Sequence, residues 1–369
     1  MSRVDEMFAQ FNRKAKYQLA RRGLQWEPLE RIPFSSPRLN YMLYGGAPFG
    51  AILEFSGKES SGKTTTALDL IANAQCLYPD RDIVFIDVEG TLDVFWAAKL
   101  GVDVDKLCYM SPQQETAEDI FQLVLDLLED DKTDMSLIII DSLAAMIPKQ
   151  AYEKQMDQAT VGGISKALTL FSNKVGPLLR KKHTILVGIN QVRDDMNSMY
   201  GGVVTPGGKA WKHNCSIRME FRRSDFFDES GNTVSTSAEN PAGHFVKSVL
   251  LKTKVCRPDR KFGFYALNYL NGIDKVLDLI DVGVKVGVCQ SRGAWYYTAD
   301  ENGEELKFNG KAKFKAALEA DENLLKLFEQ RVNDILTPEE SIDKSAQLRD
   351  VMETDLPQDV NLDGNEKQE

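Results

Sequence analysis

Residues 57–64 read GKESSGKT and fit the pattern G-x-x-x-x-G-K-[ST] at every constrained position. The apolar run AILEFS precedes them, and the helix-like stretch TTTALDLIANAQ follows. A glycine-rich turn between a strand and a helix directs backbone N–H groups and the positive helix end at phosphate. The stretch therefore predicts a phosphate-binding loop, with Lys63 reaching the outer phosphates and Thr64 ligating Mg²⁺. The expected phosphate contacts are Gly57, Lys58, Glu59, Ser60, Ser61, Gly62, Lys63, Thr64 and Thr65.

Short apolar runs alternate with helix-like stretches from about residue 32 to residue 273. The strongest runs are DIVFIDVE, SLIIIDS, HTILVGINQ and SVLLKTKV, which are rich in branched aliphatic residues. Several carry no polar face, as is typical of parallel strands covered on both sides. The pattern predicts an α/β fold with a mostly parallel, twisted sheet flanked by helices.

Acidic residues end two of these runs. Asp141 closes SLIIID, which suits a carboxylate that acts near Mg²⁺, and Glu89 closes VFIDVE, which suits a general base for water. Asp87 is an alternative base, because it lies two residues before Glu89 on the same run. Each carboxylate could instead cap a helix.

The chain divides into four predicted parts. Residues 1–31 form a basic helix, with apolar residues that include Phe8 and Phe11, and a linker. Residues 32–273 form the core, and residues 274–337 form a small α/β domain that ends in the helix-like ENLLKLFEQRVNDIL. Residues 338–369 hold ten acidic and three basic residues with little periodicity, which predicts a disordered tail.

Charge, cysteine content and apolar runs limit the classes of protein to which this chain can belong. The net charge of −10 includes −7 in the tail, whereas the first 25 residues carry +4, so the total charge does not argue against nucleic acid. The five cysteines are dispersed, which argues against a disulfide framework or a zinc site. No apolar run is long enough to cross a membrane and no signal peptide is visible, so we expect a cytoplasmic protein.

Residues 193–213, RDDMNSMYGGVVTPGGKAWKH, hold four glycines and show no clear period. So long a stretch without evident structure is typical of a functional or disordered loop. Its chemistry suits single-stranded nucleic acid: cations for phosphates, glycines for close backbone approach, and Met and Tyr side chains for bases. The expected contacts are Arg193, Met196, Tyr200, Gly207, Gly208, Lys209 and Lys212.

Eight short motifs follow in order between about residues 34 and 335: GKESSGKTT, FIDVEGTLD, KLGVD, IIIDSLAAMIPK, INQVR, TPGGKAWK, KTKVCRP and GAWYY. In this order they resemble the bacterial RecA recombinase family, including its phage-encoded members. The resemblance implies an ATP-dependent recombinase that forms helical filaments on single-stranded DNA. It further implies that the filament pairs this strand with a homologous duplex and exchanges strands, assisted by single-strand-binding and loader proteins.

The resemblance also implies roles for single residues. Glu89 matches the catalytic base, Trp96 an adenine-stacking aromatic and Asp93 a contact to the base. Gln191 matches a sensor of the γ-phosphate. Lys252 and Lys254 match a pair that reaches the ATP of the neighbouring subunit.

Residues 153–166 resemble a first DNA loop, with Gly162 and Gly163 as its hinge. The chain departs from the family pattern at Asp194 and Asp195, where two carboxylates would repel phosphate. It also carries Ala167 near an expected arginine, for which Lys166 or Lys174 could substitute. Two alternatives remain: a ring-forming helicase on the same core, and a regulatory ATP-binding paralogue without strand exchange.

Overall fold

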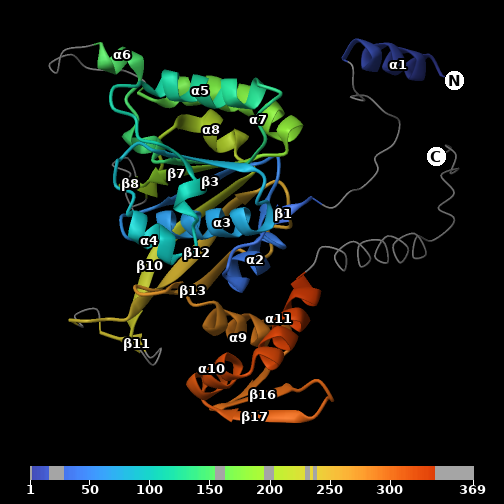
Figure 1. Ribbon diagram of the computed structural model, residues 1–369, viewed down its shortest axis with the longest axis vertical. Helices are drawn as coiled ribbons and strands as arrows, with labels where there is room; N and C mark the ends of the chain where they lie inside the picture. Colours follow the sequence, from blue (N-terminus) through green and yellow to red (C-terminus); the bar gives the residue numbers. More distant parts are fainter. Residues whose placement is uncertain are drawn as a thin grey trace, which may run out of the picture. The chain divides into compact units, whose positions relative to one another are not determined.

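The structure is a computed structural model that describes residues 2–15, 29–153, 163–194, 203–228, 233–235 and 239–336 (Figure 1). The chain forms two units, Met1–Glu30 and Arg31–Glu369. The first unit holds helix α1 (Arg3–Ala15), on which Val4, Met7 and Phe11 are each more than half exposed. None of the helices in the described ranges is long and apolar enough to cross a membrane.

A ten-stranded sheet organises the second unit, in the order β14-β13-β12-β10-β3-β7-β6-β4-β5, with β11 paired to β10. Neighbours from β10 to β5 run parallel, whereas β11, β12, β13 and β14 add antiparallel. The strands are β3 (Ile52–Gly57), β4 (Asp82–Asp87), β5 (Cys108–Met110), β6 (Met135–Asp141), β7 (Ile185–Gln191), β10 (Ile217–Phe227), β11 (Thr233–Val234), β12 (Gly243–Thr253), β13 (Phe262–Asn268) and β14 (Gly272–Ile273).

Helices cover both faces of this sheet (Figure 1). One buried cluster joins the sheet to α2 (Pro37–Leu43), α3 (Lys63–Leu77) and α4 (Val94–Lys99), and the other joins it to α5 (Ala117–Glu129), α7 (Ser165–Lys182) and α8 (Gly208–Asn214). Strands β3, β6 and β7 are buried almost throughout because both faces are covered. The predicted α/β class, with a mostly parallel sheet flanked by helices, is confirmed.

Short elements complete the core. These are β1 (Arg31–Ile32), β2 (Ala47–Pro48), η1 (Val104–Lys106), η2 (Leu143–Ala145), α6 (Lys149–Tyr152), β8 (Arg193–Asp194) and β9 (Val203–Val204). The first six residues of the run SVLLKTKV lie on β12, and Lys254 follows the end of this strand. Strand β12 is antiparallel to both neighbours and alternates between buried and more exposed side chains.

The C-terminal part is a small α/β unit with its own apolar cluster, centred on Phe314 and Phe328. Its elements are α9 (Lys275–Val286), β15 (Gln290–Arg292), β16 (Trp295–Ala299), β17 (Glu305–Asn309), α10 (Lys311–Ala320) and α11 (Glu322–Leu336). Asp278 on α9 is 1% exposed and joins this part to α2, because it accepts hydrogen bonds from the Ser36 hydroxyl and the Arg38 N–H.

The register of the parallel strands brings distant residues to one edge of the sheet. Gly57 at the end of β3 pairs with Gln191 at the end of β7, and Asp87 at the end of β4 pairs with Asp141 at the end of β6. The carboxyl ends of parallel strands are the usual binding edge of an open α/β sheet. This edge holds the candidate site.

Candidate functional site

The phosphate-binding loop runs from the end of β3 to the start of α3. Gly62 precedes the helix with φ +90°, and a Cβ there would lie only 3.2 Å from Val246 and 3.4 Å from Leu267. A side chain would therefore be strained as well as crowded. No side chain caps α3 among the described residues, so its first N–H groups can serve an external anion.

Lys63, the first residue of α3, is 8% exposed. Its Nζ donates to the carbonyl of Lys58 at 2.7 Å, which folds the side chain over the loop. Burial lowers the pKa of Lys63, and the charges of Asp141, Glu89 and Glu59 act in the opposite direction. The ammonium group therefore lies among carboxylates at the open edge of the sheet.

Thr64 donates its hydroxyl hydrogen to Oδ2 of Asp141 at 2.7 Å. The pKa of Asp141 is raised to about 6, mainly by burial and also by the charges of Glu89 and Asp87, whereas the Thr64 hydrogen bond and the charge of Lys63 act in the opposite direction. A hydroxyl beside a carboxylate is an oxygen donor set that fits Mg²⁺, which takes few protein ligands and completes its shell with phosphate and water. No cluster of three or more His, Cys, Asp or Glu side chains that could hold a metal ion occurs in the described ranges.

Glu89 lies two residues beyond the end of β4. Its Oε1 accepts a hydrogen bond from the Ser142 hydroxyl at 2.5 Å and another from Nε2 of Gln191 at 2.9 Å. The edge of the sheet thus brings together the predicted base and the predicted γ-phosphate sensor. Sequence reasoning missed Ser142, although it directly follows Asp141.

Asp87, the alternative base, is 2% exposed and its oxygens are occupied. It accepts hydrogen bonds from the N–H groups of Gly90 at 2.8 Å and Leu92 at 2.9 Å, and from the Tyr109 hydroxyl at 3.1 Å. These bonds hold the turn that carries Glu89. Asp87 therefore supports this turn, and Glu89 stays the predicted base.

A cavity of about 400 Å³ lies beside the loop at Gly62 and Thr65, and Trp96 lines it. The remaining residues that line it are Ser60, Arg223, His244, Leu267 and Tyr269. Asp93 does not line this cavity; it caps α4 and accepts a hydrogen bond from the Trp96 N–H at 3.0 Å. Sequence reasoning missed His244 and Tyr269, because only the pairing of β12 with β13 brings them to the loop.

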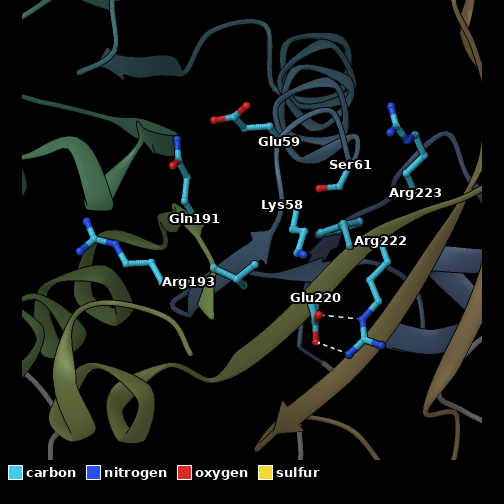
Figure 2. Close-up of a pocket in the computed structure, with 10 residues that line it drawn as sticks. Lys58, Glu59, Ser61, Gln191, Arg193, Glu220, Arg222 and Arg223 are labelled. Atoms are coloured by element: carbon cyan, nitrogen blue, oxygen red, sulfur yellow. Dashed lines mark hydrogen bonds and ion pairs between the residues drawn. The ribbon is translucent and has the colours of Figure 1, made fainter. Parts of the chain in front are cut away.

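A larger cavity of about 860 Å³ lies along the loop at Lys58, Glu59 and Ser61 (Figure 2). In Figure 2, Gln191 and Arg193 lie on one side, and Arg222 and Arg223 on the other. The remaining lining residues are Val192, Glu220 and Phe221. Glu220 pairs with Arg222 through two contacts of 2.7 and 3.0 Å. The cavity connects the phosphate-binding loop to the start of the predicted DNA loop.

Lys252 and Lys254 do not line either cavity. Nζ of Lys252 donates to the carbonyls of Lys212 at 2.7 Å and His213 at 2.6 Å, near the C-terminal end of α8. Burial lowers the pKa of Lys252, and the charge of Lys254 lowers it further. The two ammonium groups are therefore close enough to repel each other.

The stretch 193–213 is more ordered than its sequence suggests. Strands β8 and β9 pair antiparallel, and α8 follows, so the expectation of a long stretch without regular structure is wrong for these parts. Gly207 precedes α8 with φ +106°, and a Cβ there would lie 2.9 Å from Leu168. Arg193 and Lys209 are exposed, and Gly208 and Lys212 are partly exposed on α8; Met196 and Tyr200 lie outside the described residues.

Glu54 anchors α8 to the strand that carries the phosphate-binding loop. Its carboxylate is fully buried and accepts hydrogen bonds from Nε1 of Trp211 at 3.0 Å, Nδ2 of Asn190 at 3.0 Å and Nε of Arg218 at 2.5 Å. Because β3, β7, β10 and α8 meet at this one group, movement of α8 is tied to the sheet beneath the loop.

The first predicted DNA loop is described only at its end. Gly162 lies outside the described residues, whereas Gly163 is exposed with φ +44° and is closely followed by α7. Lys174 is exposed on α7, well inside that helix.

This chain is similar to known proteins over most of its length. Residues 4–274 match the family model for the RecA N-terminal domain. The protein named Protein RecA of Kineococcus radiotolerans is 34% identical over 324 residues, covering 87% of each chain. Protein RecA of Aquifex aeolicus is 35% identical over 308 residues, covering 83% of this chain and 84% of that protein.

The crystal structure of the RadB recombinase aligns with a TM-score of 0.47 and 18% identity, covering 64% of this chain and 95% of that chain. The family model alone extends over well more than half of the 369 residues and includes the phosphate-binding loop and both predicted DNA loops. The chain belongs to the RecA recombinase family.

Proposed function

We propose that this chain is a DNA-stimulated ATPase that forms helical filaments on single-stranded DNA, pairs that strand with a homologous duplex and exchanges strands. The observation that carries the proposal is the contact between Glu89 and Gln191. That hydrogen bond joins Glu89, the proposed general base, to Gln191, which lies two residues before Arg193 and the proposed DNA loop. A nucleotide site and a DNA loop are thereby joined through one hydrogen bond.

The proposed hydrolysis uses groups that the sheet edge already orients. Glu89 accepts a proton from the attacking water, and Ser142 and Gln191 fix its carboxylate for this role. Lys63 and the N–H groups at the start of α3 bind the phosphates. Thr64, and indirectly Asp141, would hold Mg²⁺, which would supply positive charge for the phosphate oxygens. Trp96 and Tyr269 line the space proposed for the adenine.

Gln191 is proposed to couple binding of the γ-phosphate to the position of the DNA-binding segment. Without a competing acceptor, its Nε2 is engaged by Glu89. A γ-phosphate oxygen offers a second, more highly charged acceptor, so the amide would reorient and move the chain that follows it. Arg193, Gly207 and Lys209 would then meet the phosphate backbone of DNA.

The proposed filament places residues of one copy against the nucleotide of the next. Lys252 and Lys254 line neither cavity beside the loop of their own chain, and Nζ of Lys252 donates to carbonyls of α8. In the proposed filament this pair reaches the nucleotide of the next copy. Helix α1, with Met7 and Phe11 exposed at 59% and 56%, is proposed to dock on the adjacent copy. The proposed organisation is therefore an oligomerisation segment at 1–31, a core at 32–273, a small domain at 274–337 and an acidic tail at 338–369.

Electron microscopy with single-stranded DNA, with and without a non-hydrolysable ATP analogue, tests this proposal. We expect continuous helical filaments that lengthen with the analogue. Discrete rings would favour the alternative of a ring-forming helicase on the same core. Absence of assembly together with retained ATP binding would favour a regulatory paralogue.

A further inference from the structure

His244 is a buried histidine that the proposed hydrolysis does not use. It lies on β12, is 3% exposed and lines the 400 Å³ cavity together with Thr65, Trp96 and Tyr269. Its Nδ1 lies 2.9 Å from the Tyr269 hydroxyl oxygen, and the two ring centroids are 5.5 Å apart. We propose that His244 is a positioning residue for the nucleobase: it holds the Tyr269 side chain as a wall of the base pocket.

The hydrogen-bonding pattern of the imidazole supports this role. Nε2 of His244 is buried and has no hydrogen-bond partner among the described residues. A buried N–H group that has lost its water and found no other acceptor costs free energy. The ring proton of His244 is therefore placed on Nδ1, which can donate it to the Tyr269 hydroxyl. The Tyr269 hydroxyl then keeps its own hydrogen for an acceptor, and heteroaromatic bases carry ring nitrogens of that kind.

The surroundings keep His244 neutral and in place. Burial, and then the charge of Arg223, lowers the pKa of His244 to about 4. Arg223 is itself held over the Phe226 ring, 5.4 Å from its centroid, and the Phe226 and His244 rings meet edge to face with centroids 6.4 Å apart. Tyr269 is 42% exposed, and the contact with His244 holds the hydroxyl end of its side chain.

The inference rests on the proposed nucleotide site and adds a residue that acts on the base alone. Its test compares ATP with inorganic tripolyphosphate, which carries the same phosphate chain but no base. Calorimetric titration of the full chain with each compound, in the presence of Mg²⁺, gives two dissociation constants. We expect His244→Leu and Tyr269→Phe each to weaken ATP binding roughly three- to tenfold, the worth of one hydrogen bond. Tripolyphosphate binding should stay unchanged.

Two conservative variants separate positioning from packing. His244→Asn places an amide N–H near the position of Nδ1 and should restore ATP binding to within about twofold, whereas His244→Gln directs its amide toward the Nε2 position and should not. In a Tyr269→Phe background, His244→Leu should add no further loss, because the contact is already gone. Tyr269→Phe is the variant least prone to misfold, since its ring stays in place.

Three outcomes would overturn the inference. They are equal losses for ATP and tripolyphosphate, indistinguishable Asn and Gln variants, and Tyr269→Phe binding ATP as the unaltered chain does. If the unaltered chain binds ATP no more tightly than tripolyphosphate, the base pocket fails while the phosphate site stands. If it binds neither compound, the proposed function itself fails.

Discussion

Gln191 donates a hydrogen bond to Glu89 across 2.9 Å, although 101 residues separate them in the chain. The same carboxylate oxygen accepts from Ser142, so two donors hold it in place. We expect Glu89→Gln to reduce ATP turnover by about 10²- to 10⁴-fold, because the general base is lost while the phosphate contacts remain. Nucleotide binding, measured by calorimetry, should change little.

Asp87→Asn is the matched comparison for that experiment. Asp87 accepts two backbone N–H groups in the turn after β4, so its replacement should lower the free energy of unfolding by about 1–3 kcal/mol. Urea denaturation measures this loss. Normal turnover in Glu89→Gln, with loss of turnover in a folded Asp87→Asn, would show that Asp87 is the base and that Glu89 is not.

Lys63→Ala should abolish both hydrolysis and ATP-dependent assembly on DNA. The ammonium group is the cation that reaches over the loop, and no other described side chain in that turn of α3 carries a positive charge. DNA-stimulated phosphate release measures hydrolysis, and Lys132→Ala, on an exposed turn, serves as a control. Full DNA-stimulated activity in Lys63→Ala would contradict the assignment of this loop.

Mixing two inactive variants tests whether Lys252 and Lys254 act on a neighbouring copy. Lys63→Ala lacks a phosphate site but keeps the lysine pair, whereas Lys252→Ala/Lys254→Ala lacks the pair but keeps the loop. Lys63→Ala should not assemble alone, but the partner variant keeps its ATP site, so mixed assemblies on single-stranded DNA would contain junctions that join an intact loop to an intact pair. We expect ATPase activity above the sum of the separate variants, as for an arginine finger supplied in trans. No recovery despite verified co-assembly would place the lysines within their own copy.

Trp211→Phe should loosen the anchor of α8. Nε1 of Trp211 donates to the buried Glu54 carboxylate, and loss of a bond to a charged group should cost about 1.5–3 kcal/mol of the free energy of unfolding. Stimulation of ATPase by DNA should fall with it. Trp295→Phe, at a position 37% exposed on β16, should cost less than about 0.5 kcal/mol. Equal stability losses in the two variants would argue against the anchor.

Asp278 predicts a specific dependence of stability on pH. Burial raises its pKa from 3.8 to about 7, so the folded chain binds this proton more tightly than the unfolded chain. The stability that the group contributes is complete below about pH 4 and is lost as the pH rises to about 7. Asp278→Asn should therefore gain stability relative to the unaltered chain over this range, by up to about 4 kcal/mol.

The pH profile of urea denaturation for both chains checks that sign. Glu319→Gln, a half-exposed position on α10, is the control and should follow the unaltered chain. A difference between Asp278→Asn and the unaltered chain that stays constant from pH 4 to pH 7 would show that Asp278 does not titrate in this range.

The parts predictable from sequence are those that local chemistry determines. The motif at Lys63 and Thr64 requires a strand, a turn and a helix in succession, and apolar runs ending in Asp141 and Gln191 identify strands whose ends face a ligand. The fold class follows from the alternation of apolar strand-like runs with helix-like stretches. These features depend on neighbours in the chain.

The missed features depend on pairing between distant segments. Strands β8 and β9 are two residues long and α8 is seven, which is too short for a periodic pattern to emerge. Trp211, within this stretch, is fully buried and bonded to Glu54, a residue more than 150 positions earlier in the chain. His244 and Tyr269 approach the loop only through the register of β12 on β13, which no local pattern reveals.

The pairing of Gly57 with Gln191, and of β3 with β10, has a consequence for how the protein matures. Two parallel strands cannot pair until the segment that connects them has been made. Contacts between residues so distant in sequence therefore form late and slowly. During synthesis the phosphate-binding loop emerges early but lacks Gln191 until more than half of the chain has been made. Tyr269 follows later still. A nascent chain that binds ATP through both Gln191 and Tyr269 would therefore already contain every parallel strand of its central sheet, while its C-terminal unit was still to be made.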